Sequence, residues 1–142
     1  MKLKIKIKKL RPDVRLPEYA LEGDAGMDIF SNEDVIIQPG EGHTFATGFA
    51  LEYPEGYVSL IWDKSGLSSK YGLKVMGGVL DHNYRGEYMV CLGNFSNQAY
   101  EFKKGDKIAQ LLIQAIISAE LEEVEELSES VRGENRHGST GK

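Results

Sequence analysis

The chain has 142 residues, the usual length of one domain with a sizeable core, and this leaves no room for a second folded domain. Its formal net charge of −5 at pH 7 argues against a general nucleic-acid binder, because phosphate backbones are held by clustered lysine and arginine. A single cysteine, Cys91, excludes an intrachain disulfide, and no apolar run approaches membrane-spanning length.

Residues 2–10 alternate basic and apolar side chains, which predicts an amphipathic outer strand. Leu3, Ile5 and Ile7 would lie on one face, and the lysines between them on the other, where they discourage edge-to-edge pairing. A nuclear or nucleic-acid signal is the alternative, but a basic tag does not require strict alternation. The segment also lacks the continuous apolar stretch of a secretion signal, so we expect a soluble, cytoplasmic protein with no membrane partner.

Short strands and turns follow one another up to residue 62. Strand-like runs lie at the end of residues 23–30 and at residues 35–37, 44–51 and 57–62. Turns recur about every 8–12 residues, which is typical of an all-β sandwich, jelly roll or barrel. No internal repeat is visible.

Residues 63–73 interrupt this β pattern. Their mixture of serine, glycine, lysine and leucine predicts a loop that leads into one short helix. Ser65 and Ser68 are the candidate N-caps, because a serine hydroxyl can accept from the free backbone N–H groups at the start of a helix.

Residues 77–87 (GGVLDHNYRGE) predict a hairpin with a carboxylate at its mouth. Val79 and Leu80 lead into Asp81, a polar turn follows, and a return strand begins after Gly86. The twin glycines before the strand allow backbone or ligand to approach closely, because neither has a Cβ. The same residues also fit an ordinary hairpin whose aspartate and asparagine serve the turn.

Strands are predicted again at residues 100–102 and 108–117, with a turn between them. Residues 119–129 are ambiguous. Their glutamates, with apolar residues at spacing three, favour a helix, whereas every neighbouring segment is of β type.

Residues 128–142 contain almost nothing apolar, so the segment cannot bury enough surface to offset its ordering entropy. It is either a frayed terminus or a mobile arm. Arg132 and the glycines and hydroxyls of residues 138–141 are suited to wrapping phosphates, which favours an arm.

Five short motifs, taken in order, resemble those of the trimeric deoxyuridine triphosphatases (dUTP pyrophosphatases). Any single motif is weak, but their order and spacing match over nearly the whole chain. They are AGMDI at residues 25–29, KSGL at 64–67, GVLDHNYRG at 78–86, GDKIAQL at 105–111 and the arm at 132–141.

The resemblance implies an all-β fold, a jelly-roll β-barrel or sandwich with one short helix. Residues 1–131 would form the β domain, and residues 132–142 a flexible C-terminal arm that closes the active site of a neighbouring subunit. It further implies a homotrimer with shared active sites, in which the hairpin and the arm come from different subunits than the other three motifs. Within residues 119–129 it implies a strand exchanged between subunits.

The activity implied by the resemblance is hydrolysis of dUTP to dUMP and pyrophosphate, which supplies dUMP for dTMP synthesis and keeps uracil out of DNA. This reaction needs a water aimed at the α-phosphorus, a base, and cations that neutralise the phosphate oxygens. Asp81 resembles the residue that orients and deprotonates the water. Mg²⁺ is the implied cofactor, held largely by the triphosphate because it keeps several of its waters, with Asp28 acting indirectly through water.

The resemblance also assigns the substrate contacts. Backbone groups of the hairpin would read uracil, and Tyr84 would lie beneath the deoxyribose and leave no room for a 2′-hydroxyl. The uracil and deoxyribose residues are Gly78, Val79, Leu80, Tyr84 and His137, and the phosphate residues are Lys64, Ser65, Gly66, Gln110, Arg132, Gly138 and Ser139.

Two places depart from the family pattern. In the second motif, Asp63 and Lys64 stand where the family usually has proline and arginine, and lysine cannot make the bidentate contacts of arginine. In the arm, Asn135, Arg136 and His137 replace Gly-Gly-Phe, so a smaller ring would stack over uracil. We expect these changes to affect affinity and arm movement more than the type of reaction.

Three alternatives remain. A dCTP deaminase, alone or combined with dUTP hydrolysis, resembles this fold, but Cys91 stands where its catalytic glutamate would align, and a thiol cannot relay the protons of deamination. A non-catalytic nucleotide-sensing module would be expected to lack Asp81 or the arm. Without the resemblance, a carbohydrate-binding jelly roll would also fit the strand pattern.

Overall fold

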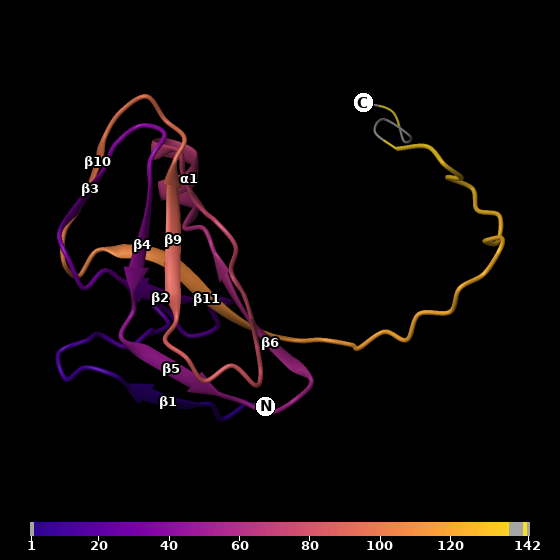
Figure 1. Cartoon of the computed structure of the whole chain (residues 1–142), viewed down its shortest axis with the longest axis horizontal. Coiled ribbons are helices and arrows are strands. Elements are labelled where there is room, and N and C mark those ends of the chain that lie inside the picture. The colour runs from indigo at the N-terminus through magenta and orange to yellow at the C-terminus, as the bar shows by residue number, and fades with distance from the viewer. Residues whose placement is uncertain (1, 137–140, 142) are drawn as a thin grey trace.

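The computed structural model describes residues 2–136 and 141 and shows a body of short strands with one helix (Figure 1). The strands are β1 Lys6–Lys9, β2 Met27–Phe30, β3 Val35–Ile37, β4 Gly42–Ala46, β5 Phe49–Glu52, β6 Tyr57–Trp62, β7 Leu73–Val75, β8 Val79–Asp81, β9 Met89–Asn94, β10 Tyr100–Phe102 and β11 Lys107–Ala115, and the helix is α1 Ser65–Tyr71.

Strand pairing divides this body into four antiparallel sheets. The largest has the order β2-β11-β6-β8, a second has β4-β9-β7, and the pairs β1-β5 and β10-β3 complete it. In the described part of the chain none of these sheets closes into a barrel. The all-β prediction with one short helix is therefore confirmed, in the form of packed sheets.

Apolar side chains from all four sheets meet in one core. Its largest fully buried members include Tyr88, Phe45, Phe49 and Phe102. Phe45 lies edge-on to Phe102, with ring centroids 5.4 Å apart, which is an arrangement that aromatic pairs prefer. This core anchors β2 through Ile29 and β11 through Leu111, and these two strands carry residues of the candidate site.

Strand β1 covers only the second half of the strand predicted at residues 2–10. It pairs with β5, with Lys6 opposite Glu52, and the two side chains form an exposed ion pair at 3.2 Å. Ile7 on this strand remains 39% exposed. The alternation therefore predicted a strand correctly but overstated its length.

The prediction of one strand at residues 44–51 is wrong, because the segment divides between β4 and β5 at Thr47 and Gly48. Gly48 has a φ of +79°, and a Cβ there would collide with the side chain of Val14. Only glycine takes this conformation easily and leaves room for Val14. The β-branched and aromatic residues continue on both sides of the turn, so the pattern hides it.

The predicted helix is present, but its predicted caps are wrong. Lys64 occupies the N-cap position in extended conformation, with no side-chain cap. Ser68 Oγ instead donates to the carbonyl of Ser65 at 3.3 Å. The helix ends at Gly72, whose φ of 66° is the left-handed conformation that glycine adopts readily.

Residues 116–136 contain neither helix nor strand and extend away from the body (Figure 1). Leu121 is 93% exposed and Leu127 is 88% exposed. The single chain offers these apolar side chains no packing partner, so neither the helix nor the strand considered for residues 119–129 forms in it. Among the described residues, no helix is long and apolar enough to cross a membrane.

Candidate functional site

Asp28, on strand β2, is the buried centre of a charged cluster and is only 3% exposed. Lys64 Nζ lies 2.6 Å from its Oδ1, and Lys107 Nζ lies 2.9 Å from its Oδ2. Burial alone would raise the pKa of Asp28, but the two lysines outweigh burial and hold the pKa of this carboxyl below its usual value. Asp28 is therefore ionised at neutral pH.

Strand β11 brings two further residues to this cluster because it pairs with β2 on one side and β6 on the other. It carries Lys107, and it places Gln110 opposite Asp28 in register. Gln110 Nε2 donates to the carbonyl of Asp63 at 2.7 Å. Gly26 makes this placement possible, since a Cβ there would collide with the Gln110 side chain.

Asp63, which stands where the second motif usually has proline, restrains the loop before helix α1. Its Oδ1 accepts from the Val75 N–H at 2.6 Å, and its other oxygen pairs with Lys74. Both partners lie on β7. Asp63 thus restrains the loop by hydrogen bonds, where a proline would restrain it through its ring.

A pocket of about 290 Å³ opens beside the cluster, at the start of helix α1. Lys64, Lys70 and Lys107 line it, together with Gly66. Three ammonium groups around one pocket favour an anionic ligand. Lys64 and Gly66, both predicted to bind phosphate, meet here, and Ser65 lies between them in the chain.

The second group of predicted residues lies on the hairpin that β8 begins. Asp81 is the last residue of β8, and it is exposed. The Tyr84 N–H donates to the Asp81 carbonyl at 3.1 Å, and the Tyr84 hydroxyl donates to the Glu87 carbonyl at 2.9 Å. A Cβ at Gly86 would collide with the Tyr84 ring. The ring is therefore fixed by the return side of the hairpin.

The close approach predicted for the twin glycines is confirmed at Gly78. Its φ is +115°, and a Cβ there would lie 2.5 Å from the carbonyl oxygen of Ile61 on β6. The Ile61 N–H donates to the Gly78 carbonyl at 2.7 Å. Gly77 also has a positive φ, +84°, but a Cβ there would meet nothing within 4 Å.

Three hydroxyl groups that the sequence analysis did not single out lie directly behind this hairpin. Tyr53 Oη lies 2.6 Å from the carbonyl oxygen of Leu80 and contacts Ser59, which in turn contacts Tyr88. All three side chains are buried. The one sequence signal was Ser59, a polar residue in the middle of the apolar run YVSLIW.

The hairpin and the lysine pocket lie toward opposite ends of strand β6. Asp81 is opposite Val58 in the β6–β8 pairing, whereas Lys64 follows the end of β6 at Trp62. At ~3.3 Å per residue, Val58 and Trp62 are about 13 Å apart along the strand. A single chain therefore brings Asp28, Lys64 and Gln110 together but does not bring Asp81 to them.

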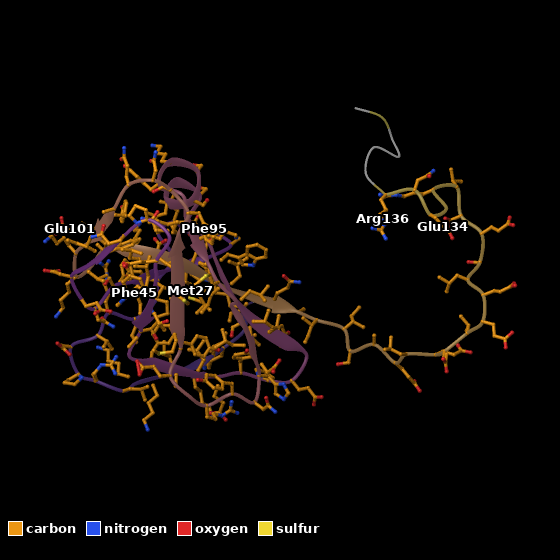
Figure 2. All side chains as sticks on the ribbon, turned by 45° about the horizontal axis from the view of Figure 1, so that its top comes forward. Met27, Phe45, Phe95, Glu101, Glu134 and Arg136 are labelled. Carbon is orange, nitrogen blue, oxygen red and sulfur yellow. The ribbon has the colours of Figure 1, made fainter. Side chains whose placement is uncertain are left out.

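The C-terminal segment is a third, separate location. Figure 2 shows Glu134 and Arg136 on the extended part of the chain, away from the strands. Arg132 bonds locally there, with its Nε donating to the Asn135 carbonyl at 2.9 Å. The predicted residues His137, Gly138 and Ser139 lie outside the described residues.

Residues able to hold a metal ion are sparse. In residues 2–136 and 141, no group of three or more His, Cys, Asp or Glu side chains gathers in a way that could bind one. Asp28 is the one carboxylate within the lysine cluster, and both its oxygens accept from lysines. Such a donor set fits Mg²⁺ only where phosphates and waters supply most of the ligands.

Known proteins resemble this chain along nearly its whole length. A family model described as dUTPase matches residues 13–141. The chain is 47% identical to a deoxyuridine 5'-triphosphate nucleotidohydrolase of Nautilia profundicola, over 99% of this chain and 100% of the relative. It is 46% identical to the protein of the same name from Clostridium tetani, over 97% of each chain.

Solved structures of dUTPases also resemble this chain. The dUTPase of Staphylococcus bacteriophage 80alpha with dUPNHPP has a TM-score of 0.88 and 34% identity, covering 97% of this chain and 98% of that one. A mutant dUTPase from phage phi11 of S. aureus, described with a structural Mg(II) ion, has a TM-score of 0.78 and 32% identity. That alignment covers 87% of this chain and 97% of the phage chain.

Proposed function

The chain belongs to the dUTPase family, and we propose that it hydrolyses dUTP to dUMP and pyrophosphate. The observation that carries this function is the lysine-lined pocket beside Asp28, which three separate family motifs build together. Clustered ammonium groups suit a polyphosphate and not a neutral sugar. In the cell this activity would supply dUMP for dTMP synthesis and keep uracil out of DNA.

Phosphate binding falls to Lys64 and Gly66, which line this pocket, to Ser65 between them in the chain, and to Gln110, which bonds to the Asp63 carbonyl. The Lys64 side chain is 31% exposed, so an anion can reach its ammonium while Lys107 continues to hold Asp28. The ammonium would then be shared between the carboxylate and the phosphates. In the complete site we place Arg132, Gly138 and Ser139 of the arm around the same phosphates.

Asp81 is the proposed general base. Its exposed carboxylate would orient a water and accept its proton as that water attacks the α-phosphorus, a contribution of typically ~10²–10⁴-fold. Because attack and proton removal occur on the same water, the Asp81 carboxylate must point toward the position of that water. The hairpin backbone provides that direction.

The same hairpin is proposed to select the nucleoside. Backbone N–H and C=O groups of Gly78, Val79 and Leu80 would read the edge of uracil, except the Leu80 carbonyl, which accepts from Tyr53 Oη instead. A mismatched base leaves buried polar groups unpaired. Tyr84, held by its bond to Glu87, would lie beneath the deoxyribose and exclude a 2′-hydroxyl. His137 would stack over the uracil from the arm.

Mg²⁺ is the proposed metal, and the family is consistent with a divalent ion. When bound to the triphosphate it supplies neutralisation of charge on the phosphate oxygens. Asp28 would contact the ion only through water. Its lysine partners favour this indirect role, since they already occupy both carboxylate oxygens.

We propose that the complete active site forms in a homotrimer. The separation of the hairpin, the lysine pocket and the C-terminal segment within one chain supports this assembly. A groove of about 1090 Å³ is lined mostly by apolar side chains, among them Leu3, Tyr19 and Leu111, and also by Lys2, Glu22 and Asp24. The exposed apolar side chains of residues 119–129 of another copy, such as Leu121 and Leu127, would pack into it as an exchanged strand.

In that assembly, residues 1–131 form the β domain and residues 132–142 the arm that closes a neighbouring site. The cytoplasmic location and the absence of nucleic-acid partners remain predictions from sequence.

Neither a dCTP deaminase nor a bifunctional deaminase is favoured. Cys91 lies on β9 opposite Thr44, and a thiol there cannot relay the protons of deamination. The nucleotide-sensing alternative is disfavoured because Asp81 and Arg132 are both present.

Product analysis tests this function. The purified chain is incubated with Mg²⁺ and, in separate reactions, dUTP, dCTP, dTTP and UTP, while pyrophosphate and base identity are followed together. We expect dUMP and pyrophosphate from dUTP alone. Deamination of dCTP would move the assignment to the deaminases, and binding of dUTP without turnover would indicate a sensor.

A further inference from the structure

A chain of three buried hydroxyl groups lies behind the strand that carries Asp81. Tyr53 is 4% exposed, and Ser59 and Tyr88 are 0% exposed. Tyr53 Oη lies 2.6 Å from the Leu80 carbonyl oxygen and accepts from the Ser59 backbone N–H at 2.9 Å. Ser59 Oγ lies 3.0 Å from Tyr53 Oη and 2.6 Å from Tyr88 Oη. The chain ends on the carbonyl one residue before Asp81.

The direction of donation follows from which groups can accept. The Tyr53 hydroxyl donates to the Leu80 carbonyl, which can only accept. Tyr88 Oη lies 2.6 Å from Ser59 Oγ, where either hydroxyl can donate. We assign Tyr88 as the donor, because Ser59 Oγ can then donate onward to Tyr53 Oη or, at 3.3 Å, to the Leu80 carbonyl. Burial raises the pKa of Tyr88, which keeps its phenol protonated as a donor.

Packing alone does not require these polar groups. Buried hydroxyls lose their hydration, whereas apolar side chains of similar size would fill the same space without that loss. What a fully bonded network adds is a single defined arrangement of its members. Strand β8 needs such a restraint, because it has three residues, lies at the edge of its sheet, and leaves Val79 72% exposed.

Tyr88 extends the restraint to the return side of the hairpin. Its N–H donates to the Phe49 carbonyl at 3.0 Å, and its carbonyl accepts from Thr47 Oγ1 at 2.7 Å. Its side chain reaches Leu80 through Ser59. Both sides of the hairpin are thus tied to one buried residue, although the Asp81 side chain itself is exposed.

We propose that Tyr53, Ser59 and Tyr88 are positioning residues, whose hydroxyl network holds the Leu80 carbonyl and so directs the Asp81 carboxylate at the water it activates. This rests on the proposed function, because the direction of Asp81 matters only when it acts on bound dUTP. The three hydroxyls are buried behind the hairpin and touch no substrate. Their removal therefore lowers turnover more than nucleotide binding.

Tyr53→Phe tests the proposal, because it breaks the link to Leu80 with little change of shape. We expect kcat for dUTP to fall about 10- to 100-fold, as small displacements of a catalytic group do. Binding of dUMP, measured by titration calorimetry, should stay close to that of the wild-type chain. Tyr100→Phe is the matched control: Tyr100 is a half-buried tyrosine on β10, outside the network, and its loss of a hydroxyl should leave kcat unchanged.

Thermal unfolding of each variant establishes that it is folded at the assay temperature. An unchanged kcat in folded Tyr53→Phe would overturn the proposal, and so would a fall in kcat matched by an equal loss of dUMP affinity. If Tyr53→Phe does not fold, Tyr88→Phe is judged by the same two outcomes. Wild-type chain that fails to hydrolyse dUTP would overturn the proposed function as a whole, whereas a failure confined to the variants overturns the positioning role alone.

Discussion

Lys64 Nζ lies 2.6 Å from Asp28 Oδ1 and joins the residue before helix α1 to a buried carboxylate of strand β2. Lys107 holds the other oxygen at 2.9 Å. Asp28 thereby stays ionised in the interior and keeps two ammonium groups at the edge of one pocket. In the proposed site the triphosphate would compete with Asp28 for Lys64, and the balance between these partners would govern affinity.

Lys64→Met removes the ammonium but keeps much of the side-chain length. Asp28 retains Lys107, so we expect the free energy of unfolding to fall by about 1–3 kcal/mol, the range for a buried polar group that loses a partner. Affinity for dUTP should also weaken. Lys70→Met is the control, since Lys70 lines the same pocket and no ion pair joins it to Asp28 among the described residues. Denaturant unfolding of the two variants gives the comparison, and equal stability would contradict a structural role for Lys64.

The pH dependence of stability should report on Asp28. Its pKa is lower in the folded than in the unfolded chain, so its ionisation stabilises the fold above the ordinary aspartate pKa of about 3.9 and this contribution is lost as the pH falls through the folded-state pKa. The difference in unfolding free energy between wild type and Asp28→Asn should be constant from about pH 8 to 5 and shrink below about pH 4. Denaturant titrations at one fixed protein concentration measure it, because assembly contributes to stability. A difference that is unchanged down to about pH 3 would contradict the lowered pKa.

Asp81→Asn should abolish most turnover and leave nucleotide binding intact. The amide keeps the size of the side chain and cannot accept the proton of the attacking water, so we expect kcat to fall ~10²–10⁴-fold. Steady-state kinetics with dUTP and calorimetric titration with dUMP separate the two effects. Near-normal turnover in this variant would remove Asp81 from the role of base.

Gly78→Ala and Gly77→Ala form a matched pair that isolates the close approach to β6. Both glycines have positive φ, so each substitution should cost about 1–2 kcal/mol of backbone strain. Only the Cβ at position 78 would lie 2.5 Å from the Ile61 carbonyl oxygen. Gly78→Ala should therefore lose about 1–3 kcal/mol more, as overpacked sites do. Denaturant unfolding checks this, and equal losses would show that the β6–β8 contact yields easily.

Truncation after Val131 should leave a folded assembly with greatly reduced activity. Residues 132–142 contribute no strand to the body in the described residues, so their removal should not change thermal unfolding. Their proposed task is to close a neighbouring site over the phosphates. The test combines dUTP hydrolysis with measurement of the molecular mass in solution. Activity equal to that of the full chain would show that the segment is only a frayed terminus.

Local features of the fold were predictable from the sequence. Most of the strands and turns, the short helix and the hairpin with Asp81 at its mouth follow from hydrophobic alternation and turn residues, which act over a few neighbours. Strand β7 was not predicted. Even here the turn at Gly48 was hidden. A glycine is needed at this position because a Cβ there would collide with Val14, which is distant in sequence and close in space.

The candidate site was predictable only as a set of residues. Sequence motifs named Asp28, Lys64, Gln110 and Asp81, but nothing local indicates that Lys107 shares Asp28 with Lys64. The local sequence also gives no sign that three hydroxyl groups converge behind Leu80.

What the sequence determined by itself is therefore the kind of element each segment forms and the residue types available for chemistry. Only the tertiary structure decided which residues meet, because contacts between distant segments depend on the register in which strands pair. The pairing of β11 with β2 places Gln110 opposite Asp28, and the pairing of β6 with β8 leaves Asp81 toward the far end of β6. A one-residue slip in either pairing would turn these side chains to the opposite face of the sheet, and the site residues would no longer lie together.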